Sequence, residues 1–300
     1  MFSVYCKFLN MINLKQISVI GMGLLGASVT LAVKRELPSA QVIGYSHRAK
    51  TRQKAREAGV AHEIAETLQE SVKNADIVIL ATPIQTFKNY FLEISRYLKD
   101  GCIVTDVGST KLLPHHWAKK YLPKKVSYVG SHPIAGSEKR GVEFARDDLL
   151  TNARCILTKT NGTSTTSIEL LRWFWSRLGC TVIVMSPENH DRILGRVSHL
   201  PHLTAAALVN ANTLQDMKFA GRGFIDTTRV ASGPADIWTD ILMTNPANCV
   251  AGIERLITQL RLIQDAVRSE DKKKIEKFLT QAARKRAQLI QYKIEQKELF

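Results

Sequence analysis

The sequence predicts an α/β fold, in which a doubly wound sheet forms the N-terminal part and helices alone form the C-terminal part. Up to Met185, short apolar strands alternate with helical segments, which is typical of a parallel sheet covered by helices on both faces. Beyond Met185, helical patterns continue to Phe300 without a convincing strand. A glycine-rich turn after the first strand supports the same class of fold.

The expected elements follow from apolar runs and breaker residues. The strands are expected at 17–20, Gln41–Tyr45, 76–81, 102–106, 126–129, Arg154–Thr158 and Thr181–Met185. The helices are expected at 27–35, 50–58, 167–178, 188–212, Ala235–Thr244, Pro246–Arg268 and 271–298. There are no internal repeats that would suggest a solenoid.

A chain of 300 residues suggests two domains. We expect an N-terminal extension at 1–14, a dinucleotide-binding domain at 15–185 and a helical domain at 186–300. Ser186-Pro187-Glu188 is a typical helix start, with Ser as the N-cap and Pro in the first turn. Because the helical part offers few layers to bury its apolar faces, we expect it to pair with a second copy in a homodimer.

Composition narrows the class of protein. The 45% of hydrophobic residues excludes wholesale disorder, and the net charge of +15 predicts attraction to anionic ligands or polyanions. No apolar run reaches the roughly 20 residues that span a bilayer, so no membrane partner is expected. The five cysteines lack metal-ligand spacing and indicate thiols in a cytoplasmic protein. They are Cys6, Cys102, Cys155, Cys180 and Cys249.

The turn after the first strand fits the dinucleotide fingerprint G-x-G-x-x-G, and it is followed by a helix. It reads Gly21-Met22-Gly23-Leu24-Leu25-Gly26. Gly21 permits the tight turn, Gly23 lets a pyrophosphate approach the backbone, and Gly26 lets helix and strand pack closely. The helix N-terminus then faces the phosphates, so the pattern predicts a Rossmann-type domain that binds a nicotinamide dinucleotide.

The end of the second strand indicates which dinucleotide binds. An acidic residue there would accept the ribose hydroxyls of NAD, but this chain has Ser46, His47 and Arg48, with Lys50 and Arg52 nearby. A hydroxyl and several cations suit a 2′-phosphate. We therefore favour NADP over NAD as the cofactor.

Three further segments follow expected strands and point to the same crevice. Two of them are Ala81-Thr82-Pro83 and the run D-V-G-S-T-K at 106–111. Ligands of open α/β sheets bind beyond the carboxyl ends of the strands, so both segments are expected to line this crevice. The third, 130–141, places His132 in a loop at a strand end. An imidazole titrates near the working pH, so His132 is a candidate general base.

These segments together resemble the prephenate dehydrogenase family, which includes arogenate and cyclohexadienyl dehydrogenases. The resemblance lies in the glycine fingerprint, D-V-G-S-T-K, G-S-H-P-I-A-G-S-E-K-R-G-V-E at 130–143 and V-S-H-L-P-H at 197–202, and it covers about 15–264. It implies a Rossmann domain followed by a helical dimerisation domain. It also implies oxidative decarboxylation of prephenate to 4-hydroxyphenylpyruvate in tyrosine biosynthesis, with hydride passing to the cofactor and no metal ion.

The resemblance also implies roles for single residues. His132 matches the catalytic histidine that accepts the hydroxyl proton, and Ser109 matches a serine that orients it and the substrate. His202 matches a second active-site histidine, and Arg229, in G-F-I-D-T-T-R, matches an arginine that binds a substrate carboxylate. Trp238 matches an aromatic residue near the site.

His199 and the departures from the family pattern leave alternatives open. His199 lies three residues before His202 on one helix face, where it is either structural or part of the site. Gly233 stands where the family commonly has an acid, and Arg222 where it has glycine. Because a missing acid disfavours an ammonium group, prephenate is favoured over arogenate.

Two other functions remain alternatives. An NADP-dependent hydroxyacid dehydrogenase would share the first domain but would use a lysine of the helical domain as its acid or base. A nucleotide-sensing protein that binds nucleic acid would use the basic runs at 272–274 and 284–286. The helix that carries those runs has acids interspersed, and no aromatic platform accompanies them, so a solvated helix face and no nucleic-acid partner are expected.

Overall fold

The computed structural model describes residues 14–135 and 139–296. The expected extension up to residue 13, with Cys6, and residues 136–138 of the histidine run lie outside the described residues. The chain forms two compact units, one ending at Pro246 and the other beginning at Ala247. Leu14, which we assigned to the extension, is instead buried in the core of the first unit.

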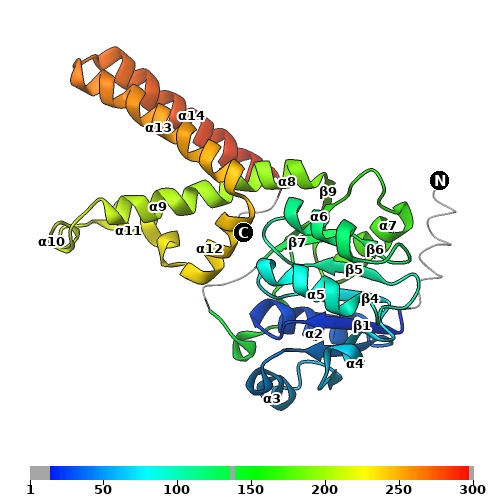
Figure 1. Cartoon of the computed structure of the whole chain (residues 1–300). Coiled ribbons are helices and arrows are strands. Elements are labelled where there is room, and N and C mark those ends of the chain that lie inside the picture. Colours follow the sequence, from blue (N-terminus) through cyan, green and yellow to red (C-terminus); the bar gives the residue numbers. More distant parts are fainter. Residues whose placement is uncertain (1–13, 136–138, 297–300) are drawn as a thin grey trace. The chain divides into compact units, whose positions relative to one another are not determined.

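A parallel sheet of six strands, in the order β3-β2-β1-β4-β5-β6, forms the centre of the first unit (Figure 1). The strands are β1 (Gln16–Ile20), β2 (Gln41–Tyr45), β3 (Glu63–Ile64), β4 (Ile77–Leu80), β5 (Ile103–Asp106) and β6 (Ser127–Tyr128). The order of connection reverses between β1 and β4, which is the point where open α/β sheets bind their ligands. The predicted doubly wound fold is confirmed.

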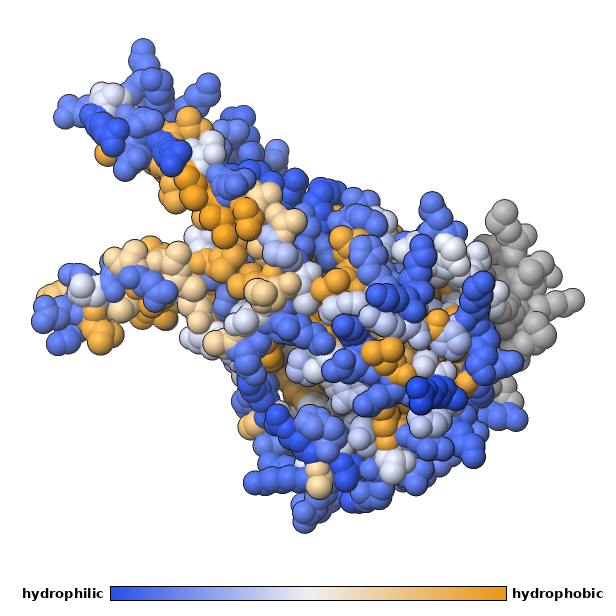
Figure 2. All heavy atoms as spheres, in the orientation of Figure 1, coloured by the Kyte–Doolittle hydropathy of each residue, from blue (hydrophilic) through white to orange (hydrophobic). Residues whose placement is uncertain are grey.

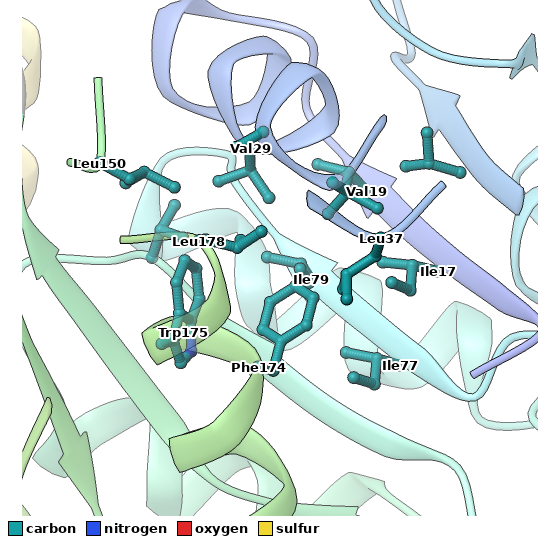
Figure 3. Packing of buried hydrophobic residues seen from close by; sticks show 14 of the residues in the cluster. Ile17, Val19, Val29, Leu37, Ile77, Ile79, Leu150, Phe174, Trp175 and Leu178 are labelled. Carbon is teal, nitrogen blue, oxygen red and sulfur yellow. The ribbon is translucent and has the colours of Figure 1, made fainter. Parts of the chain in front are cut away.

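Helices cover both faces of this sheet. One face packs against α2 (Leu24–Glu36), α3 (Ala49–Glu57) and α7 (Thr165–Arg177), and Figure 3 shows Phe174 beside Ile79 and Trp175 beside Leu178. The opposite face packs against α4 (Leu68–Val72), α5 (Phe87–Ile94) and α6 (Leu112–Tyr121). A short 3₁₀ turn, η1 (Ile84–Thr86), links β4 to α5. Both faces of β1 and β4 are buried, which explains their continuous apolar sequences.

A second sheet of three strands contains the histidine segment. Its strands are β7 (Gly130–Ile134), β8 (Arg154–Thr158) and β9 (Thr181–Met185), with β7 antiparallel and β9 parallel to β8. Another 3₁₀ turn, η2 (Val142–Phe144), precedes β8. The placement of His132 in a loop is wrong, because β7 pairs His132 with Ile156. Pro133 is tolerated in β7 because β7 is an edge strand.

After β9 the first unit is helical, and the single helix expected at 188–212 is interrupted. Its parts are α8 (Pro187–Leu194), the π-helical turn η3 (Gly195–His199) and α9 (Leu200–Asn210). Pro201 has no N–H and its ring crowds the preceding turn, and a wider turn relieves both problems. The remaining elements are α10 (Leu214–Met217), α11 (Arg222–Thr228), η4 (Arg229–Ser232) and α12 (Ala235–Thr244).

The second unit consists of two long helices, α13 (Pro246–Arg268) and α14 (Lys272–Glu295), which Figure 1 shows as a hairpin. Figure 2 shows hydrophobic side chains along this hairpin. Exposed apolar residues follow one face of α13: Val250, Ile253, Ile257 and Leu260. Among the described residues, no helix is long and apolar enough to cross a membrane.

Candidate active site

The glycine turn between β1 and α2 leaves room for a phosphate group. Gly21 has a φ of +109°, and a Cβ on it would lie 2.4 Å from the Ala81 carbonyl oxygen. A Cβ on Gly26 would lie 1.9 Å from the Gly21 oxygen, whereas one on Gly23 would meet nothing within 4 Å. Gly23 caps α2 without any side-chain hydrogen bond, and the first turn of α2 contains no acid. These features fit the backbone cradle that a dinucleotide pyrophosphate requires.

The turn and the end of β4 come together, as predicted from the parallel sheet. Met22 is buried against Gly44 of β2, and Leu24 and Leu25 are half-buried in the first turn of α2. Ala81 and Thr82 lie directly against Gly21, and Pro83 is the exposed residue that leads into η1. The edge of the sheet at its switch point is therefore lined by backbone and small side chains.

The loop after β2 holds the residues expected to select the cofactor. Ser46 is buried, while His47 and Arg48 are exposed. Arg52 points back into the loop, where its Nη1 donates to the Ser46 oxygen at 2.8 Å and the His47 oxygen at 3.2 Å. It also forms an ion pair with Glu66, at 3.1 Å. Arg52 therefore shapes the loop, while Arg48 and Lys50 are cations that face solvent.

His132 is only partly exposed, and its Nδ1 lies 2.8 Å from Nε2 of His190 on α8. The Nδ1 of His190 lies 2.7 Å from Oδ1 of Asp191. Burial, followed by His190, Lys111 and His199, lowers the pKa of His132 well below its ordinary value. His132 is thus neutral at neutral pH, which a proton acceptor must be before the reaction.

A buried ion pair holds the segment between β5 and α6 beneath this histidine. Lys111 and Asp106 pair with no exposure on either side chain. Asp106 also accepts hydrogen bonds from the Tyr128 hydroxyl at 2.9 Å, the Gly108 N–H at 2.9 Å and the Ser131 N–H at 3.2 Å. Because Ser131 precedes His132, this network fixes the strand that carries His132. Such a fully bonded pair is costly to break on one side only.

Ser109 lies half-buried in the same segment. Its hydroxyl has no hydrogen-bond partner among the residues that the structure describes, so it can bond to a ligand. The Nδ1 of His132 is hydrogen-bonded to His190 and not to Ser109. His132 thus has His190 as its hydrogen-bond partner, which was not expected. Ser109, which was expected to orient His132, has its hydroxyl available for a ligand.

His202, His199 and Trp238 form an aromatic cluster. The rings of His202 and Trp238 are stacked, with centroids 3.6 Å apart and an interplanar angle of 9°, and the His199 ring lies edge-on to Trp238 at 6.4 Å. His202 is buried, and its Nδ1 has no hydrogen-bond partner within the described part of the chain. Burial lowers the pKa of His199 to about 4.

Arg229 begins η4, which packs against α9, the helix that carries His202. Its side chain is exposed. Gly233, at the end of η4, lies against both rings of the stack: a Cβ there would be 2.3 Å from Trp238 Nε1 and 3.0 Å from His202 Cε1. The expected substrate-binding residues are therefore carried by adjoining elements of the first unit.

His190 and Asp191 are the residues that sequence reasoning missed. They lie in the second turn of the helix that begins after Ser186, where a polar His-Asp pair looks like part of an ordinary solvated helix face. The structure buries both, with exposures of 0% and 1%. The only signal in the sequence is the adjacency of a histidine and an aspartate, and His132, the partner of His190, is 58 residues away.

Comparison with known proteins gives consistent results. Residues 29–184 match the family model described as the prephenate dehydrogenase nucleotide-binding domain, and residues 186–281 match its dimerization domain. Prephenate dehydrogenase of Bacillus subtilis is 33% identical over 87% of this chain and 72% of its own length. The match to a cyclohexadienyl dehydrogenase of Zymomonas mobilis is 29% identical, over 86% of this chain and 90% of that protein.

A solved structure has the same architecture. The prephenate dehydrogenase of A. aeolicus, solved with hydroxyphenyl propionate and NAD+, has a TM-score of 0.86 at 30% identity and covers 93% of this chain and 99% of its own. The protein is thus an oxidoreductase with a nicotinamide dinucleotide-binding domain. From the glycine turn, the strand order and these matches together, the chain belongs to the prephenate dehydrogenase family.

Proposed function

We propose that this protein converts prephenate to 4-hydroxyphenylpyruvate and CO₂ while hydride passes to a nicotinamide cofactor. The observation that carries the proposal is the state of His132, whose imidazole is neutral, partly exposed and hydrogen-bonded through Nδ1 to His190. The segments expected to bind the cofactor and the substrate belong to the same compact unit. The family membership of the chain makes this reaction class the natural one.

The cofactor, when bound, supplies the nicotinamide ring that accepts the hydride. The turn from Gly21 to Gly26 and the N-terminus of α2 would hold its pyrophosphate through backbone N–H groups. Ala81, Thr82 and Pro83 would flank the nicotinamide end, since they follow β4 at the switch point.

His132 would bind the hydroxyl on the ring carbon that loses hydride. As the hydride departs, that oxygen becomes strongly acidic, so even a weakly basic imidazole can accept its proton. The electron pair of the carbon–carboxylate bond then moves into the ring, CO₂ leaves, and the ring becomes aromatic. His132 can return the proton to the phenolate oxygen, so the reaction needs no net proton.

The other residues would bind and orient the substrate. Arg229 would hold a carboxylate through two parallel hydrogen bonds, which a planar guanidinium does well. His202 would contact the substrate beside Trp238, which would pack along the substrate ring. Ser109 would bond to the reacting hydroxyl, and His199 would support Trp238 from the side.

For the cofactor we propose NADP in preference to NAD. Ser46 and Arg48 would contact the 2′-phosphate, His47 would add a third donor, and Arg52 would keep the loop in shape. The nearby acid, Glu66, is already paired with Arg52 and Arg56 and so repels a phosphate less.

The direct test is a steady-state comparison of prephenate and arogenate with each cofactor. We expect a higher kcat/KM with prephenate than with arogenate, because Gly233 leaves no acid to bind the ammonium group of arogenate. We expect a higher kcat/KM with NADP than with NAD, because Ser46 and Arg48 would contact the 2′-phosphate. A clear preference for arogenate would assign the chain to the other branch of the family. A clear preference for NAD would contradict the roles of Ser46 and Arg48.

We further propose a homodimer, formed through the helical region from residue 186. The exposed apolar face of α13 and the match to a dimerization domain support it. Light scattering should give twice the chain mass of 33.6 kDa. We assign the reaction to the cytoplasm, since Cys102, Cys155 and Cys180 are buried thiols rather than disulfides.

A further inference from the structure

The imidazole of His132 is the outer member of a row of three bonded side chains, His132, His190 and Asp191, which we call the triad. The two inner members, His190 and Asp191, are buried, so neither side chain contacts bulk water. Oδ1 of Asp191 accepts the Lys111 N–H at 2.7 Å, and its Oδ2 accepts the Leu112 N–H at 2.9 Å. The carboxylate is thus fixed by the first turn of α6.

The geometry points to a single tautomer for each ring of the triad. A carboxylate that accepts two backbone N–H groups has no proton to give, so the Nδ1 of His190 must donate to Asp191. A neutral imidazole carries only one proton, so Nε2 of His190 is an acceptor. Therefore the Nδ1 of His132 donates to it, and we infer that His132 Nε2 is left as the unprotonated nitrogen.

This tautomer matters for the proposed reaction, on which the role of the triad rests. A free neutral histidine prefers the proton on Nε2, and in that form His132 would present an N–H instead of a lone pair to the substrate hydroxyl. His190 and Asp191 are positioning residues that hold His132 in the rarer form. When His132 takes up a proton, its Nδ1–H bond to His190 strengthens, and the charge of Asp191 compensates the imidazolium through His190.

Burial keeps His190 neutral. Lys111 approaches from α6 and is paired with Asp106 of β5, His115 also comes from α6, and His199 comes from η3. Burial first, and then the positive charge of Lys111, lower the pKa of His190 far below its ordinary value, with smaller contributions from His199 and His115. His115 is itself held by the Thr158 hydroxyl at 2.9 Å. A neutral His190 can accept the hydrogen bond from His132.

The tautomer can be measured without any turnover. Long-range ¹H–¹⁵N correlation spectra of the ¹⁵N-labelled full-length protein report which ring nitrogen of each histidine is protonated. The His132 and His190 signals are assigned by their loss in His132→Gln and His190→Gln. We expect both rings to be protonated at Nδ1. A His132 ring protonated at Nε2 overturns the inference, whatever the substrate of the enzyme proves to be.

Kinetics separates positioning from mere support of the fold. In His190→Gln the side-chain amide oxygen can occupy the place of Nε2 and accept from His132, whereas His190→Leu offers no acceptor. We expect His190→Leu to lower kcat for prephenate about 100-fold with KM changed less than about threefold, and His190→Gln to recover about tenfold of the loss. The acid limb of kcat should move to lower pH in His190→Leu, because the imidazolium of His132 loses its acceptor.

The matched control is His115→Leu, which removes another buried imidazole, one that bonds Thr158 and not His132. Its kcat should stay within about threefold of the wild type. Equal losses in His190→Leu, His190→Gln and His115→Leu would mean that His190 only fills space, and would overturn the positioning role. A wild-type protein that does not turn over prephenate would instead contradict the proposed function, while the tautomer measurement would still stand.

Discussion

Gly233 determines the shape of the aromatic cluster at the scale of single residues. The Trp238 ring occupies the space that a side chain at 233 would need, since a Cβ on Gly233 would lie 2.3 Å from Trp238 Nε1 and 2.8 Å from Cδ1. The glycine therefore permits the stack of Trp238 on His202. Position 233 therefore offers no side chain of its own, and the Trp238 ring fills the space beside it.

Gly233→Ala should push the Trp238 ring away from His202 and weaken substrate binding. We expect KM for prephenate to rise about tenfold, which corresponds to about 1.4 kcal/mol, with a smaller change in kcat. Steady-state kinetics measures both constants. Gly162→Ala is the control, because a Cβ at Gly162 meets nothing within 4 Å. An unchanged KM in Gly233→Ala would show that the stack does not contribute to binding.

The sequence could indicate which residues meet where local backbone and sheet topology decide it. The glycines of the turn and Ala81 to Pro83 meet because parallel strands end at one edge of the sheet. His190 and Asp191 could not be predicted in the same way. Their function depends on burial and on contact with His132, and both come from the packing of α8 against β7, which no local pattern encodes.

At the scale of elements, α12 holds the segment that follows β4. Asp240 of α12 accepts the N–H groups of Ile84 and Gln85 at 2.5 and 3.0 Å, and so caps η1 from outside. Thr244, one turn later, bonds to Thr110 at 2.9 Å. Trp238 lies on the same helix, so the element expected to contact the substrate is tied to the strand ends expected to contact the cofactor.

Asp240→Asn should destabilise this connection. The asparagine amide has only one oxygen, so one of the two N–H groups loses its acceptor, and we expect a loss of about 1–3 kcal/mol in the free energy of unfolding. Asp236→Asn on the same helix is the control. Asp236 forms an exposed ion pair with Arg140, and such pairs contribute roughly 0–1 kcal/mol. Urea unfolding measures both variants, and equal losses would contradict the capping role of Asp240.

Two elements differed from prediction for identifiable reasons. Gly130 and Pro133 are weak strand formers, so β7 was expected to be a loop, but as an edge strand it needs no hydrogen bond from the proline. The helix from α8 to α9 was expected to be continuous, because its apolar periodicity continues through η3. The spacing of apolar residues along the sequence does not reveal a single wider turn such as the one before Pro201.

At the scale of the whole molecule, buried histidines should make the fold sensitive to acid. Burial lowers the pKa of both His115 and His199 to about 4, and an unfolded histidine titrates near 6.5. Between these values the unfolded chain binds more protons than the folded chain, so stability falls as the pH falls. Above about pH 6.5 both states are neutral at these residues and the effect disappears.

Lowering the pH from 7 to 5 should therefore reduce the free energy of unfolding by about 2 kcal/mol for each of these two histidines. Urea unfolding at both pH values measures the loss. In His115→Gln the loss should be smaller by about 2 kcal/mol, since the amide does not titrate. The same pH dependence in variant and wild type would show that His115 binds a proton as easily in the folded state as in the unfolded state.

The fold class and the order of elements were predictable because both depend on apolar periodicity summed over many residues. The net charge of +15 was less informative. Arg48 and Arg229 have proposed anionic partners, but charge by itself does not reveal which cations converge on one site. Convergence is a property of the folded molecule, and the same holds for the neutral state of His132 in its buried setting.

The central claim is that His132 accepts the hydroxyl proton as hydride leaves prephenate. The most direct measurement is kcat for prephenate with NADP in the wild type and in His132→Gln, followed through the reduced nicotinamide and the released CO₂, with cofactor binding measured in parallel. The account predicts that kcat falls about 10²- to 10⁴-fold while the Kd for NADP stays unchanged. A His132→Gln variant that retains full turnover would contradict it.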